Sequence, residues 1–223
     1  MLAAMTDATA EAALPARGRL WAEFLALFLG VPALMAVYFG SYPLFPALIG
    51  LTVLALILLA LTPGWRWRKL LKGPVLGEWR IVLGFALATA LVCYAVIQYA
   101  APQRFLAMPR YNPQLWLAIM VLYPVLSALP QEIIYRSLFF ERYGALFPSK
   151  AVAILVNGAA FALGHLFFQN WIVIAMTGAG GAIMGWAWLR HGSLGLAWIL
   201  HSLAGQILFT FGLGIYFYHG AIR

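Results

Sequence analysis

The chain has 223 residues, of which 65% are hydrophobic and 9% are charged, whereas a soluble globular domain carries about 25% charged residues. This composition excludes an ordinary soluble fold and predicts helices embedded in a membrane. The net charge of +8 does not predict a nucleic-acid partner, because the basic residues lie in short loops between apolar segments. Cys93 is the only cysteine, which excludes an intramolecular disulfide and predicts a packed core thiol.

Seven apolar segments follow one another along the chain, each near the roughly 20 residues that cross a bilayer core. They span residues 20–39, 42–61, 81–100, 115–140, 151–168, 171–189 and 194–213. The expected fold is therefore an all-α polytopic transmembrane helical bundle of about seven membrane helices. Residues 1–18 lack the apolar core of a signal peptide and are expected to form a disordered cytoplasmic tail.

The first three predicted membrane helices occupy residues 19–114. Within this part, residues 64–78 contain the aromatic and basic run WRWRKLLK, which is typical of an interfacial segment on the cytoplasmic leaflet. The lipid bilayer is thus the first predicted partner.

The basic residues also predict the orientation. Ten lie in one set of loops and three in the opposite set, so the positive-inside rule places the N-terminus in the cytoplasm of an inner (plasma) membrane protein. The ten are Arg17, Arg19, Arg66, Arg68, Lys69, Lys72, Arg80, Arg142, Lys150 and Arg190, and the three are Arg104, Arg110 and Arg223.

Proline and glycine add local expectations. Pro124 and Pro130 should kink the fourth segment just ahead of Gln131. Gly181 and Gly185 have the spacing of small residues that lets two membrane helices approach closely. We expect a packing role for these glycines.

Four ionisable residues lie within the predicted membrane segments, where burial of a charge is costly and function is the default expectation. They are Glu132 and Arg136 in the fourth segment, His165 in the fifth and His201 in the seventh. Three further residues, Glu23, His191 and His219, are expected at the surface. Glu132 and Arg136 are four residues apart and share one helix face, so a purely structural ion pair is the alternative interpretation.

This set of side chains is suited to hydrolysis of an amide. A buried carboxylate can act as a general base on water. The imidazoles can position the water, donate to a tetrahedral oxyanion, or hold a divalent metal such as zinc. No HExxH or GxSxG motif is present, which argues against a zinc metalloprotease with an HExxH helix and against a serine hydrolase with a GxSxG nucleophile elbow.

The pattern Gln131-Glu132-Ile133-Ile134-Tyr135-Arg136, then Phe161-Ala-Leu-Gly-His165, then His201 resembles the CAAX protease and bacteriocin-processing (CPBP, or Abi) family. That family includes the type II CAAX prenyl endopeptidases, and its motifs are written EExxxR, FxxxH and HxxxN. The resemblance covers roughly residues 115–213.

The resemblance implies an intramembrane endopeptidase that cleaves a membrane-associated peptide or protein, with seven helices or, as is frequent in the family, eight. It implies that residues 115–223 form the catalytic helices. The catalytic residues would be Glu132, His165, His201, Arg136 and Gln131. We expect substrate-positioning roles for Asn157, Phe161, Tyr135 and Gln206, and metal ligation by His165 and His201 only if a metal is used.

Two departures from the motifs leave alternatives open. Gln131 stands where the family has the glutamate that is held to be the general base, and an amide cannot take up a proton at neutral pH. Gly205 stands where the third motif has Asn, although Gln206 could supply an amide. Either Glu132 takes over as base, with the loss of one carboxylate slightly favouring a metal-free mechanism, or the protein is a weakened relative that binds a membrane segment as a chaperone or immunity protein. A small proton-coupled transporter is a third hypothesis, but internal repeats are not evident.

Overall fold

The computed structural model describes residues 15–38, 44–71 and 76–217, and this part of the chain is built of helices joined by short turns. Within these described ranges, six helical segments are long and apolar enough to cross a membrane. They are Arg17–Val37, Trp79–Ala100, Pro113–Leu146, Lys150–Phe168, Trp171–His191 and Leu194–Phe211. A shorter apolar helix, α3 (Leu44–Ala60), has 17 residues, the lower end of what spans a bilayer. The prediction of an all-α membrane bundle of about seven helices is confirmed, because the described residues contain six segments of spanning length and one shorter apolar helix.

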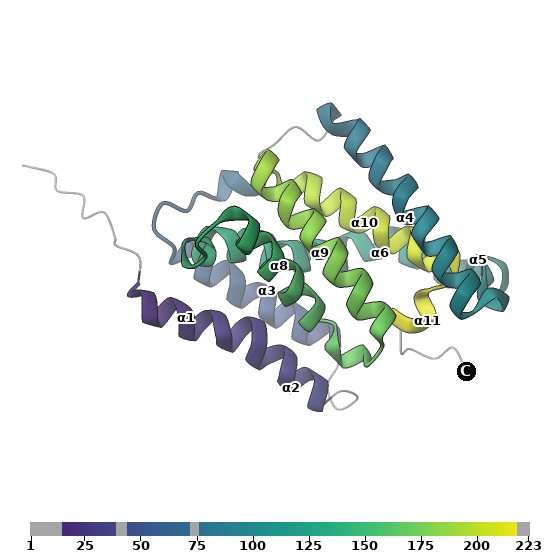
Figure 1. The fold of residues 1–223 in the computed structure, drawn as a ribbon, viewed down its shortest axis with the longest axis horizontal. Coiled ribbons are helices and arrows are strands. Elements are labelled where there is room, and N and C mark those ends of the chain that lie inside the picture. The colour runs from purple at the N-terminus through teal and green to yellow at the C-terminus, as the bar shows by residue number, and fades with distance from the viewer. Residues whose placement is uncertain (1–14, 39–43, 72–75, 218–223) are drawn as a thin grey trace, which may run out of the picture.

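The N-terminal helices lie on the flanks of the bundle. Helices α1 (Arg17–Leu25) and α2 (Val31–Val37) join through a π-helical turn and form one edge, and α4 (Trp79–Ala100) forms the other edge (Figure 1). Helix α4 packs on α10, and leucines along its outer side, such as Leu87 and Leu91, are exposed. Apolar surface of this kind is stable in lipid and not in water.

The predicted tail and interfacial segment fall partly outside the described residues. Residues 1–14 and 72–75 are not described, and α1 begins at Arg17, so the last two residues of the predicted tail 1–18 are helical. On either side of residues 72–75, the predicted segment 64–78 contains two short 3₁₀ turns, Trp67–Leu71 and Leu76–Glu78.

The long fourth segment positions the first motif. It runs through α6 (Pro113–Tyr123), a π-helical turn, α7 (Leu129–Glu132) and a second π-helical stretch before a final 3₁₀ turn. The first π turn begins at Pro124, which has no N–H to offer the carbonyl oxygen of Met120. The side chain of Gln206 donates to that oxygen instead (2.8 Å). The π-helical stretch Ile133–Tyr143 then carries Arg136, and wide turns of this kind are frequent at functional sites.

Helices α8 (Lys150–Leu163) and α9 (Trp171–His191) pack closely through small residues. A Cβ at Gly158 would lie 2.8 Å from the Gly178 carbonyl oxygen, and one at Gly181 would lie 2.8 Å from the Phe161 Cβ. The glycine face of α9 therefore fits directly against α8 and holds Phe161 in place, as the small-residue spacing predicts.

The last membrane helix, α10 (Leu194–Phe211), is started by Ser193, whose side chain accepts from the Leu196 N–H, and is followed by the short α11 (Gly214–Phe217). It packs against α4 on one side and α9 on another. Cys93, on α4, is buried together with Leu208 and Leu213, so the predicted packed thiol is confirmed. The short α5 (Ala107–Tyr111) precedes α6.

Two charged residues differ from their predicted surroundings. Arg142 was expected in a loop, but it lies in the π-helical stretch, where it is 2% exposed. Its Nε lies 2.8 Å from Glu23 Oε2, and its Nη1 donates to the Thr62 hydroxyl. Glu23, which was expected at the surface, is 19% exposed and belongs to this partly buried network. Without Arg142 the predicted count becomes nine cations against three, which still favours a cytoplasmic N-terminus.

Candidate active site

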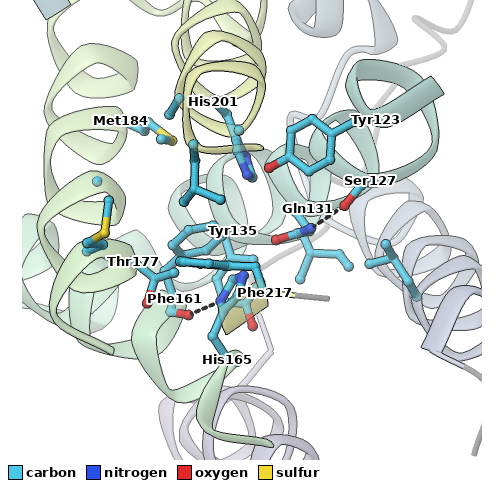
Figure 2. A pocket seen from close by; sticks show the side chains of 18 of the residues that line it. Tyr123, Ser127, Gln131, Tyr135, Phe161, His165, Thr177, Met184, His201 and Phe217 are labelled. Carbon is cyan, nitrogen blue, oxygen red and sulfur yellow. Dashed lines mark hydrogen bonds between the residues drawn. The ribbon is translucent and has the colours of Figure 1, made fainter. Parts of the chain in front are cut away.

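A cavity of about 860 Å³ opens among the membrane helices, and its walls are mostly apolar. The polar side chains on its wall come from five separate membrane segments, and most of them are labelled in Figure 2. They are Thr89, Tyr123, Ser127, Gln131, Tyr135, His165, Thr177 and His201. All three motifs thus meet at one apolar cavity.

Glu132 lies behind the cavity wall rather than on it. Its side chain is fully buried, and it does not belong to the lining residues. One carboxylate oxygen, Oε1, lies 2.8 Å from His201 Nδ1, and the other, Oε2, lies 3.1 Å from Arg136 Nε. The structure therefore brings Glu132 to the site through His201, which itself lines the cavity.

Arg136 balances the charge of this carboxylate. It lies one helical turn after Glu132 and is fully buried. Its guanidinium carbon lies 4.9 Å from the centre of the Phe161 ring, a cation–π distance. Among the described residues, none of its three guanidinium nitrogens has a hydrogen-bond partner, and Nε contacts Glu132 as an ion pair. Glu132 is therefore the group that compensates the Arg136 charge.

The hydrogen bonds define the tautomers of the two histidines. The Phe161 carbonyl can only accept, so His165 Nδ1, 2.8 Å away, carries the hydrogen. By the same reasoning, His201 Nδ1 donates to the Glu132 carboxylate. In its neutral form, each imidazole with this tautomer has an unprotonated Nε2, a hydrogen-bond acceptor, for the cavity that both residues line.

Phe161 joins the parts of the site. Its ring centre lies 4.7 Å from that of His165, 5.4 Å from that of His201 and 5.0 Å from that of Tyr135. The FxxxH spacing therefore places one aromatic ring against both imidazoles. Arg136 lies against the same ring, so Phe161 separates the buried cation from the cavity.

The other predicted positioning residues are divided. Tyr135 lines the cavity, and its hydroxyl occupies the space where a Cβ at position 164 would stand, which glycine leaves free. Asn157 is buried outside the cavity lining, where its Nδ2 donates to the Tyr135 carbonyl (2.6 Å). It supports the π-helical backbone from α8.

The two glutamines have different surroundings. Gln131 lines the cavity, and its Nε2 donates to Ser127 Oγ (3.0 Å). Gln206 is not among the lining residues of this cavity, because its amide is bound to the Met120 carbonyl. The residue that faces the cavity from the first motif is thus the neutral Gln131, with the charged Glu132 behind it.

Four polar lining residues, Thr89, Tyr123, Ser127 and Thr177, are missing from the sequence-based prediction. Tyr123, Ser127 and Gln131 follow one another at intervals of four and share one helix face. This spacing was the available signal. It gave no reason to prefer them to other polar residues, because the sequence does not show which face meets the cavity.

The donor set does not fit a zinc centre held by three protein ligands. Among the described residues, no three His, Cys, Asp or Glu side chains are grouped to hold a metal ion. His165 and His201 offer two nitrogens, while both oxygens of Glu132 are engaged by His201 and Arg136.

Residues 113–207 match the model of the type II CAAX prenyl endopeptidase family that is described as Rce1-like. The resemblance predicted from the three motifs is confirmed for this segment, which holds Tyr123, Glu132, His165 and His201. No curated protein and no solved structure matches the chain. The chain is accordingly a multi-pass membrane protein with a segment similar to CAAX-type proteases.

Proposed function

We propose that this protein, whose residues 113–207 are Rce1-like, is an intramembrane endopeptidase that hydrolyses a peptide bond in a membrane-associated peptide or protein. The observation that supports it best is the hydrogen bond between Glu132 and His201 at the cavity wall. A carboxylate that orients an imidazole toward a reacting group is the arrangement by which many hydrolases make a general base.

In the proposed mechanism, His201 is the base and Glu132 acts through it. Nε2 of His201 removes a proton from a water molecule as the water oxygen attacks the scissile carbonyl carbon. The charge of the resulting imidazolium is balanced by Glu132, and Arg136 fixes the orientation of that carboxylate. The proton then passes from Nε2 to the leaving nitrogen as the carbon–nitrogen bond breaks, giving an acid and an amine.

His165 has the second role in this mechanism. Its Nε2 is an acceptor, so it can hold the other hydrogen of the same water molecule. With both hydrogens engaged, the lone pairs of the water oxygen are directed at the substrate. The proposed mechanism therefore uses no metal, in keeping with the donor set.

The substrate class follows from the cavity and the family. The cavity is lined mainly by Leu, Val, Ile, Phe and Met side chains, so we propose an apolar C-terminal segment as the substrate. The similarity to type II CAAX prenyl endopeptidases suggests prenylated CAAX peptides, and they are the first candidates.

The test is a cleavage assay on purified protein in lipid nanodiscs. Internally quenched peptides ending in a CAAX sequence, with and without a farnesyl group, and single-span apolar peptides would be compared with and without EDTA. We expect cleavage that EDTA does not reduce, and a loss of about 10²–10⁴-fold in kcat for His201→Gln. His191→Gln is the matched control, because His191 binds Glu78 at the end of α9 (2.9 Å). Equal kcat for the wild type and His201→Gln would contradict the mechanism.

A non-catalytic membrane-segment binder is the second candidate, favoured by the amide of Gln131 at the position facing the cavity. This alternative predicts that the same peptides bind and are recovered uncleaved after incubation. Mass spectrometry of the bound peptide distinguishes the two.

We also propose that the N-terminus is cytoplasmic, on the basis of the loop charges. Seven crossings would then place the C-terminus outside. A C-terminal fluorescent reporter that matures only in the cytoplasm should stay dark, and a bright reporter would reverse the orientation.

A further inference from the structure

The two histidines offer acceptors for water, but neither they nor Arg136 offer a donor for the substrate carbonyl. The Nδ1–H of His201 donates to Glu132, and the Nδ1–H of His165 donates to the Phe161 carbonyl. Arg136 is fully buried and does not line the cavity. Amide hydrolysis develops a negative charge on the carbonyl oxygen, and hydrolases stabilise it with preorganised hydrogen-bond donors.

Tyr123 presents a donor at the right place. It ends α6 and lines the cavity, and its ring centre lies 5.9 Å from that of His201, edge to face. Its hydroxyl points toward His201 and Gln131 (Figure 2). Among the described residues, the Tyr123 ring contacts those of His201 and Phe209, and its hydroxyl makes no hydrogen bond.

Gly205 is the reason that Tyr123 fits there. Gly205 follows His201 by one turn of α10, and a Cβ at this position would overlap the Tyr123 ring and lie 2.6 Å from its hydroxyl oxygen. The departure from the HxxxN motif thus leaves a space, and the Tyr123 ring fills it with a polar group aimed at the cavity.

We propose that Tyr123 is a catalytic residue that donates its O–H to the scissile carbonyl oxygen, an inference that rests on the proposed protease function. When the water oxygen bonds to the carbonyl carbon, the electron pair of the C=O bond moves to the oxygen beside Tyr123. It returns when the carbon–nitrogen bond breaks. Tyr123 keeps its proton throughout. Gln131 can act beside it, because one amide hydrogen goes to Ser127 and the other is free.

The first test is Tyr123→Phe, which keeps the ring and removes the hydroxyl. We expect an unchanged melting temperature, a KM close to the wild type and a kcat lower by about 10²–10³-fold, the usual effect of losing one oxyanion donor. Tyr94→Phe is the matched control, because Tyr94 is exposed on α4 and contacts Phe105.

Inhibitor binding separates catalysis from packing. A phosphinic peptide imitates the tetrahedral oxyanion and should lose affinity for Tyr123→Phe by the same factor as kcat, while the uncleaved peptide amide should bind as before. A merely structural tyrosine would weaken both alike, which would overturn the proposal.

Gly205→Ala provides an independent variant. If it acts by displacing the Tyr123 hydroxyl, it should lower kcat in the wild type and have little further effect in the Tyr123→Phe background. A wild-type protein that cleaves, together with a Tyr123→Phe variant of equal kcat, would overturn this inference alone. A wild-type protein that cleaves no peptide and binds the phosphinic peptide no better than the amide would overturn the proposed function as well.

Discussion

Removing one charge of the Glu132–Arg136 pair should cost more stability than removing both. Both side chains are fully buried, and Glu132 Oε2 lies 3.1 Å from Arg136 Nε. At an effective dielectric constant of about 20, two unit charges at that distance interact by roughly 5 kcal/mol. Glu132→Gln leaves the guanidinium without its counter-charge, and breaking a buried pair in this way costs about 3–5 kcal/mol. Arg136→Met should cost a similar amount.

The double variant Glu132→Gln, Arg136→Met removes both charges and keeps the volumes similar, so we expect a loss far below the sum of the single variants. The coupling energy should reach about 3 kcal/mol, the upper end for groups in contact. The assay is reversible unfolding by denaturant in mixed micelles, with the free energy of unfolding measured for all four proteins.

The partly exposed pair Lys69–Glu141, 2.6 Å apart, is the matched control, for which a coupling of about 1 kcal/mol or less is expected. Cleavage should be lost in both variants that lack Glu132, because His201 then has no carboxylate. If the two single losses simply add in the double variant, the ion pair does not stabilise the bundle as argued here.

Three further predictions concern the site and its supports. Gln131→Glu places a carboxylate at the cavity beside Ser127 and should keep or raise kcat/KM in the peptide assay. A loss of cleavage in this variant would contradict the expectation. Gly158→Ala should cost about 1–3 kcal/mol of unfolding free energy by overpacking, because its Cβ would lie 2.8 Å from the Gly178 carbonyl oxygen. Gly50→Ala should leave the unfolding free energy unchanged, because a Cβ at Gly50 would have nothing within 4 Å. Equal losses of unfolding free energy for the two variants would refute the packing argument. Gln206→Leu leaves a membrane carbonyl without its donor and should lower stability by about 1–3 kcal/mol with an unchanged KM, while a raised KM would support the substrate role predicted from the sequence.

The sequence by itself determined the class of fold and the identity of the charged site. Long apolar runs can be satisfied in lipid only as helices, so the bundle followed from composition and segment length. The intramembrane location of Glu132, Arg136, His165 and His201 marked them as candidates for a functional site. Their helical spacing placed Glu132 and Arg136 together, and the 3.1 Å ion pair agrees with this.

Only the tertiary structure decided which groups face the cavity and which lie behind it. Glu132 and His201 are 69 residues apart, and Glu23 and Arg142 are 119 apart, so no local pattern links them. In a soluble helix an apolar stripe shows which face is buried, but a membrane helix is apolar on its lipid and core sides alike. The rotation of each helix is then set by close packing of small residues and by the need to pair buried polar groups. That rotation puts Gln131 on the cavity and Glu132 behind it, and it lets Tyr123 fill the space that Gly205 leaves.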